Sequence, residues 1–188
     1  MTANTKQFKR LLIKGTGAVF IDWANVYGWH KKLGWEVNAY RLLDYFKTYT
    51  EIKKINFYFG TDITQESKNF INSLQQLENE VFKVTTKQVK YVLDVLMPYD
   101  QNYYTKGRRK CDFDVEITRD ALNNVNDFET FILISGDGDY APLIDDMISK
   151  GKKTILIFAP GYKGKEYGDF KRGLFLCSVN KIREYVDK

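Results

Sequence analysis

The chain has 188 residues, 44% of them hydrophobic and 28% charged, with a formal net charge of +5. This length predicts one domain with a sizeable core, and the composition excludes a disordered chain. The apolar runs are too short to cross a bilayer and the first residues lack a signal-peptide pattern, so we expect a cytoplasmic protein without a membrane partner. Two cysteines exclude a disulfide framework, and a single histidine excludes a histidine-rich zinc site. The positive charge favours a polyanionic partner such as nucleic acid.

Runs rich in β-branched and aromatic residues predict five strands, over residues 17–22, 54–60, 81–92, 130–135 and 153–159. Helical patterns lie between them, over residues 38–50, 64–80, 113–125 and 140–151. Several strands are hydrophobic almost throughout, which is typical of strands that are covered on both faces in a parallel sheet. The alternation of strands and helices therefore predicts an α/β fold with three layers, in which helices flank a central, mainly parallel five-stranded sheet.

The domain organisation follows from the same pattern. We expect residues 1–188 to form a single domain whose core covers about residues 17–159. Residues 97–111 contain three tyrosines and four basic residues, and they are expected to form a surface loop inserted into this core. Residues 160–188 are a C-terminal extension, and their last ten residues predict a short strand or helix that docks at an edge.

Acidic side chains gather where the predicted strands end. Asp22 closes the first strand in FIDWAN, and Asp137 and Asp139 follow the fourth strand in ISGDGDY. Asp114 opens the helix predicted over residues 113–125, which begins near the same edge. Ligands of open parallel sheets bind at the carboxyl ends of the strands, and acids that meet there repel one another unless a cation neutralises them. Hard oxygen ligands select Mg²⁺ or Mn²⁺, so a divalent-metal site is expected at this edge.

For some of these acids the sequence allows two roles. Asp139 is either a second metal ligand or the N-cap of the helix that starts near residue 140. Asp112 stands two residues before Asp114, and either residue is a candidate to face the metal. Asp62, which follows the second strand, is a peripheral candidate on the same edge. The glycines on both sides of Asp137 are expected to permit a sharp turn and to leave room for a phosphate.

The segments FIDWAN, DVEITRDAL and ILISGDGDYAPLIDDMISKGKKTILI make the chain resemble the NYN domain family, the LabA-like branch of the PIN-like nucleases. The resemblance extends over about residues 17–159, and its most specific part is the SGDGDY segment with the helix and strand that follow. It implies a PIN-like fold and a metal-dependent ribonuclease that hydrolyses the phosphodiester bonds of RNA with Mg²⁺ or Mn²⁺. Asp114 is favoured over Asp112 because the VEIT that follows Asp114 fits the family.

The resemblance also implies roles for individual residues. The catalytic residues would be Asp22, Asp114, Asp137 and Asp139, of which the first three would hold the metal. Asn25 and Ser135 would support them by positioning the first acid or the substrate phosphate.

The proposed RNA contacts lie in YYTKGRRK, where cations can pair with phosphates and tyrosines can stack on the unpaired bases of single-stranded RNA. The candidates are Tyr103, Tyr104, Lys106, Arg108, Arg109 and Lys110. The choice of RNA over DNA rests on the resemblance alone. A catalytically inactive RNA-binding or regulatory module with the same fold is the alternative function, and self-association into a homo-oligomer stays open.

Overall fold

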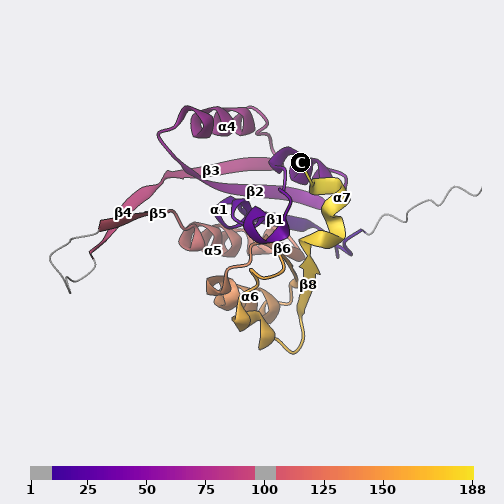
Figure 1. Cartoon of the computed structure of the whole chain (residues 1–188). Helices are drawn as coiled ribbons and strands as arrows, with labels where there is room; N and C mark the ends of the chain where they lie inside the picture. The colour runs from indigo at the N-terminus through magenta and orange to yellow at the C-terminus, as the bar shows by residue number, and fades with distance from the viewer. Residues whose placement is uncertain (1–9, 96–104) are drawn as a thin grey trace, which may run out of the picture.

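The computed structural model describes the backbone of residues 10–95 and 105–188, and the side chains of residues 10–90 and 110–188. Its main feature is a six-stranded sheet with the strand order β3-β2-β1-β6-β7-β8, in which every neighbouring pair runs parallel (Figure 1). The strands are β1 (Gly17–Asp22), β2 (Ile52–Thr61), β3 (Phe82–Gln88), β6 (Thr130–Ile134), β7 (Lys153–Phe158) and β8 (Leu174–Ser178).

The predicted α/β fold with a central parallel sheet is confirmed, but the predicted number of five strands was wrong. The sixth strand, β8, lies in the C-terminal extension and pairs with β7 at the edge of the sheet. β8 is an apolar run of only five residues, LFLCS, and as an edge strand it is partly covered, with Phe175 54% exposed.

The strand predicted over residues 81–92 is two strands. β3 ends at Gln88, and β4 (Lys90–Val95) leaves the sheet to pair antiparallel with β5 (Thr105–Lys110). The two strands form a hairpin that projects from the body of the molecule (Figure 1). The expected loop over residues 97–111 was therefore wrong for residues 105–110, whose polar sequence TKGRRK is held in a strand by backbone pairing with β4. Residues 97–104 lie outside the described residues.

Helices cover both faces of the sheet and confirm the three layers (Figure 1). Strand β1 is buried along its whole length, with Val19 and Ile21 in the hydrophobic cluster on one face and Ala18 and Phe20 in the cluster on the other. The first face carries α1 (Trp23–Tyr27), α2 (His30–Leu33), α3 (Ala39–Lys47), α4 (Gln65–Gln75) and α7 (Arg183–Val186). The second face carries α5 (Asp114–Asn123) and α6 (Ala141–Ser149).

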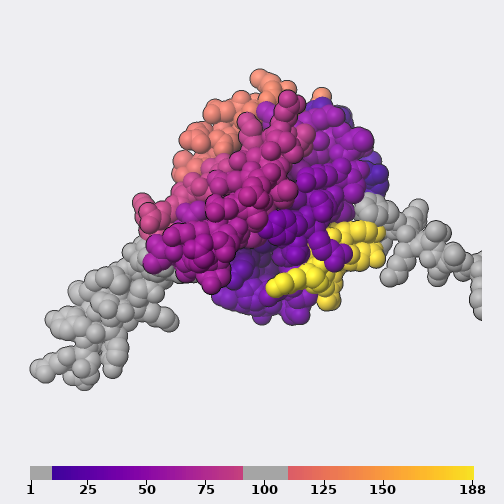
Figure 2. Space-filling view, turned by 90° about the horizontal axis from the view of Figure 1, so that it is seen from above, coloured from indigo at the N-terminus to yellow at the C-terminus, as the bar shows by residue number. Residues whose placement is uncertain are grey.

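Four 3₁₀ turns complete the described elements, namely η1 (Val125–Asp127), η2 (Gly138–Tyr140), η3 (Lys165–Gly168) and η4 (Val179–Ile182). The C-terminal residues fold back onto the first quarter of the chain, as Figure 2 shows by the yellow atoms beside the indigo and purple ones. The Arg41 guanidinium donates to the carbonyl of Glu184 over 2.9 Å, and the Lys188 N–H donates to the carbonyl of Glu36 over 3.0 Å. No helix among the described residues has the length and apolar character that crossing a bilayer requires.

The register of the central strands positions the candidate site. Ile21 of β1 pairs with Ile134 of β6, so Asp22, the last residue of β1, and Ser135, the residue after β6, lie at the same carboxyl edge of the sheet. Both strands are buried throughout, which fixes this edge against the two hydrophobic clusters.

Candidate active site

Asp22 is the most buried acid of the site, with 5% of its surface exposed. Its Oδ1 accepts a hydrogen bond from the Asn25 N–H over 3.2 Å. Its Oδ2 accepts from the Ser135 hydroxyl and from the Tyr140 hydroxyl, each over 3.2 Å. Three donors therefore compensate a carboxylate that has little contact with water, and they fix its orientation.

Burial raises the pKa of Asp22 from 3.8 to about 6. The three hydrogen bonds act in the opposite direction, and the negative charge of Asp114 adds to the increase. Ionising Asp22 at neutral pH therefore costs more free energy than ionising an exposed aspartate. A cation bound beside it would stabilise the ionised form.

Asp114 is half-buried in the first turn of α5. Burial raises the pKa of Asp114, the charges of Asp137, Asp112 and Asp139 raise it further, and a hydrogen bond with Tyr140 lowers it. The pKa of the buried Tyr140 hydroxyl is in turn raised by its burial and by Asp22 and Asp114. Tyr140 therefore stays protonated and lies between two carboxylates.

The structure separates the two acids that the sequence left as alternatives. Asp112 is exposed, and its Oδ2 lies 3.1 Å from Nζ of Lys110 in a surface ion pair. Asp114 instead shares Tyr140 with Asp22. The residue that lies beside the buried acid is therefore Asp114.

Asp137 and Asp139 have different surroundings. Asp137 is the N-cap of η2, where its Oδ1 accepts from the Asp139 N–H over 3.1 Å, and its own N–H donates to the Ser135 hydroxyl over 3.1 Å. Asp139 is exposed inside η2, and the N-cap of α6 is Tyr140, which makes no side-chain cap. The helix-cap interpretation of Asp139 was therefore wrong, because the capping carboxylate of this turn is Asp137.

Asn25 connects α1 to the loop after β6. Its Oδ1 accepts from the Gly136 N–H and from the indole N–H of Trp29, each over 2.8 Å. Together with Ser135, which contacts both Asp22 and Asp137, it holds the two strand ends in one arrangement. Both side chains are thus engaged in hydrogen bonds within the protein.

Neither Gly136 nor Gly138 has a positive φ, so the backbone conformation alone does not require glycine at these positions. They permit a close approach of residues 160–168 instead. A Cβ on Gly136 would overlap the backbone carbonyl of Tyr162, and a Cβ on Gly138 would overlap the Glu166 carboxylate. The Gly164 N–H donates to the Gly136 carbonyl over 2.8 Å, so this segment holds the loop that carries Asp137 and Asp139.

Three residues that contact this site were missed from the sequence. Tyr140 stands in the motif, but nothing in its spacing indicates that its hydroxyl reaches Asp22. Glu166 lies against Gly138, and the Tyr167 hydroxyl donates to the Asp137 carbonyl. Both belong to a segment rich in glycine and lysine, which carries no periodic signal that could have identified them.

The side chains of this cluster are of the kind that bind divalent cations, but they are not arranged as a complete metal site. Among residues 10–90 and 110–188, no three His, Cys, Asp or Glu side chains lie close enough together to hold a metal ion. Mg²⁺ usually keeps several waters and takes only one or two carboxylates together with substrate phosphates. Asp22, Asp114 and Asp137 offer such oxygen ligands. The pKa values of Asp22 and Asp114 are raised mainly by burial and also by the negative charge of neighbouring acids.

The residues expected to contact RNA lie on the hairpin. Tyr103 and Tyr104 fall outside the described residues, and only the backbone of Lys106, Arg108 and Arg109 is described, as part of β5. Lys110 is exposed and forms the ion pair with Asp112.

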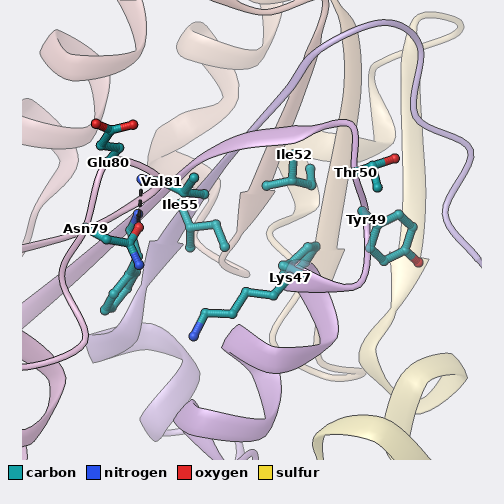
Figure 3. Close-up of a pocket in the computed structure, with 10 residues that line it drawn as sticks. Lys47, Tyr49, Thr50, Ile52, Ile55, Asn79, Glu80 and Val81 are labelled. Carbon is teal, nitrogen blue, oxygen red and sulfur yellow. Dashed lines mark hydrogen bonds between the residues drawn. The ribbon is translucent and has the colours of Figure 1, made fainter.

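Two pockets lie at opposite edges of the sheet. Figure 3 shows one of about 570 Å³ at the amino edge, where Lys47, Ile52 and Val81 lie around it and the Val81 N–H donates to Oδ1 of Asn79 over 2.8 Å. None of the candidate acids lines it. The other pocket, of about 640 Å³, begins at Trp23, the residue after Asp22, and includes Asp62.

The family model of the NYN domain matches residues 17–172. The chain is 27% identical over 173 residues to the "Low amplitude and bright protein LabA" of Synechococcus elongatus, which covers 91% of this chain and 87% of that protein. It also resembles the crystal structure of a protein of unknown function from Vibrio parahaemolyticus, with a TM-score of 0.65, 24% identity, and coverage of 90% of this chain and 96% of that one. The chain belongs to the NYN domain family.

Proposed function

We propose that this protein is a metal-dependent ribonuclease that hydrolyses the phosphodiester bonds of RNA. Its active site would consist of Asp22, Asp114, Asp137 and Asp139. Membership of the NYN domain family supports this activity. The observation that carries the proposal is the hydrogen-bonded network around Asp22. In that network, Tyr140 links this buried acid to Asp114, and Ser135 links it to the loop of Asp137.

In this proposal Asp22, Asp114 and Asp137 hold one or two Mg²⁺ or Mn²⁺ ions. A bound ion would lower the pKa of a water and neutralise charge on the scissile phosphate. Asp22 is held in one orientation by its three donors, which suits a direct ligand. Asp139 is exposed at the mouth of the cluster and serves as a further ligand or orients the attacking water.

Asn25 and Ser135 act as positioning residues. Their side chains bind the backbone N–H groups of Gly136 and Asp137 and so set the distance between the two strand ends. A loss of either side chain would move the acids relative to each other without removing a ligand.

The hairpin supports the proposal that the substrate is RNA, with single strands favoured. Its second strand ends at Lys110, four residues before Asp114, so its base lies next to the acidic cluster in the chain. Lys106, Arg108, Arg109 and Lys110 would pair with backbone phosphates. Tyr103 and Tyr104 would stack on unpaired bases.

An RNA-binding module without turnover is the second candidate function. It is favoured by the finding that, in the described parts of the chain, no three ligand side chains are close enough to hold a metal. Such a module would bind RNA through the hairpin and leave it intact at every metal concentration.

The test is cleavage of end-labelled single-stranded RNA with and without Mn²⁺ or Mg²⁺. We expect the wild type to cleave only with metal, and Asp22→Asn and Asp137→Asn to lose at least about 100-fold in rate, as for removal of a group that stabilises transition-state charge. Asp44→Asn is the matched control, because this α3 side chain is 75% exposed and pairs with Lys47 at the surface. Binding without cleavage would select the inactive module, and undiminished cleavage by both variants would overturn the site.

A further inference from the structure

The pocket that begins at Trp23 continues the acidic cluster along the carboxyl edge of the sheet. It has a volume of about 640 Å³ and lies between α1, the end of β2 and the start of α4, with Val89 and Cys111 on its far wall. Small-molecule sites in proteins typically enclose about 300–1,000 Å³. The charge of Asp22 contributes to the raised pKa of Cys111, which is due mainly to burial, so the buried acid and this wall lie within electrostatic reach of each other.

Aromatic rings form much of the pocket wall. Trp23 stacks on Phe70 with 6.0 Å between ring centroids, and Phe59 meets Phe70 edge to face at 5.1 Å. Tyr27, at the end of α1, also lines the pocket and is 68% exposed, which is unusual for so large a ring. The His30 ring makes a T-shaped contact with Tyr27 at 5.7 Å between centroids, and the Tyr27 surface that stays exposed at the pocket is available for stacking.

The charged residues that line the pocket indicate which chemical class of ligand it can bind. Two acids, Asp62 and Glu66, line the pocket, and no lysine or arginine among the described residues does. Such a lining repels phosphate and favours a flat group that carries N–H donors. The exocyclic amino groups of adenine, guanine and cytosine are donors of this kind.

We propose that this pocket binds one unpaired nucleobase of the RNA strand whose phosphate lies at the acidic cluster, an inference that rests on the proposed function. The base stacks on Tyr27 and its amino group faces the acids. A paired base cannot leave its duplex without losing its partner, so the pocket selects single-stranded RNA.

The experiment measures the dissociation constant of the full chain for a fluorescein-labelled single-stranded RNA octamer by fluorescence anisotropy, in EDTA so that no cleavage occurs. Tyr27→Ala removes the stacking ring, and Ala24→Leu fills the pocket from an exposed position on α1. Tyr27→Phe keeps the ring and is the conservative control. Phe175→Ala removes another exposed ring, 54% exposed, from β8 at the edge of the sheet, and is the matched control.

We expect Tyr27→Ala and Ala24→Leu to weaken binding at least about 5-fold, the effect of one lost stacked base. Tyr27→Phe and Phe175→Ala are expected to bind like the wild type. An octamer whose bases are replaced by abasic sites should bind equally weakly to the wild type and to Tyr27→Ala. Thermal melting of each variant checks that it is folded.

Wild-type affinity in both pocket variants overturns the nucleobase pocket. If the wild type then still cleaves RNA with metal, the proposed nuclease stands and only this inference fails. If the pocket variants lose binding but no variant or wild type cleaves, the pocket stands and the nuclease fails. If the wild type neither binds nor cleaves RNA, both fail.

Discussion

The Tyr140 hydroxyl donates a hydrogen bond of 3.2 Å to Oδ2 of Asp22, although the two residues are 118 positions apart in the chain. Asp114 also lies within reach of this hydroxyl, which lowers the pKa of that acid. Tyr140 therefore joins three separate elements, since Asp22 ends β1, Asp114 begins α5, and Tyr140 itself precedes α6. The last residue of the SGDGDY motif is thus part of the candidate site.

Tyr140→Phe removes this hydroxyl and keeps the buried ring. Since the hydrogen bond lowers the pKa of Asp22, its loss should raise that pKa and move the acidic limb of the pH–rate profile to higher pH. We also expect a rate loss of about 10-fold or more at neutral pH, because a hydrogen bond to a charged group contributes roughly 1.5–3 kcal/mol. RNA cleavage measured from pH 5 to 9 checks both effects. An unchanged profile would show that Tyr140 only packs.

Asp22→Asn should change how stability depends on pH. The folded-state pKa of Asp22 is about 6 and the ordinary value is 3.8, so the folded protein binds more protons than the unfolded chain between these values. This proton contributes its full stabilising effect below pH 3.8, the pKa in the unfolded chain, and the effect is lost as the pH rises through about 6. The free energy of unfolding then falls by roughly 3 kcal/mol. We expect urea unfolding in EDTA to show the wild type losing up to this amount relative to Asp22→Asn from pH 4 to pH 8. Parallel pH curves for the two proteins would contradict it.

Metal addition should stabilise the wild type. A ligand that binds only the folded state at 100 times its dissociation constant adds about 2.7 kcal/mol, which corresponds to a Tm increase of about 5–10 °C for a chain of this size. We expect Mn²⁺ to raise the Tm in this way and EDTA to reverse it. The increase should be much smaller in Asp137→Asn and unchanged in Asp44→Asn. An equal increase in all three proteins would place metal binding elsewhere.

Gly136→Ala should loosen the contact between the loop of Asp137 and residues 160–168. A Cβ at Gly136 would overlap the backbone carbonyl of Tyr162, and backbone cannot rotate away as a side chain can. We expect a loss of about 1–3 kcal/mol in urea unfolding, as for overpacking of a core. Gly138→Ala should cost less, because the overlapped Glu166 carboxylate can move. Gly168→Ala is the matched control, since no atom lies within 4 Å of its added Cβ, and an equal loss there would contradict the explanation.

The basic residues of the hairpin should control the salt dependence of RNA binding. Each phosphate contact to a single strand contributes about −0.7 to the slope of log K against log salt concentration. Replacing both Arg108 and Arg109 by alanine should therefore reduce the slope by about 1.4. Lys150→Ala, an exposed lysine after α6, is the control and should leave the slope unchanged. The same slope in the double variant would show that the hairpin does not contact RNA.

The sequence predicted the central strands and the acids at their ends because both depend on local pattern. β1, β6 and β7 are hydrophobic almost throughout, which only a covered strand explains. Once the sheet is parallel, the edge at which Asp22 and Asp137 leave it follows from chain direction alone. Hairpin strand β5 escaped prediction because backbone pairing with β4, and not its polar composition, holds it extended. Edge strand β8 is an apolar run of only five residues that pairs with β7.

What the sequence by itself determined is therefore the layer architecture and the location of the acidic residues near one edge. The tertiary structure alone decided that Asp114 and not Asp112 lies beside Asp22, that Asp137 caps η2, and that Tyr140 joins two carboxylates. It also brought residues 160–168 onto the glycines of the motif. The physical reason is that, apart from the local cap at Asp137, these contacts join segments far apart in the chain. Their geometry arises only when the sheet and both helical layers have packed.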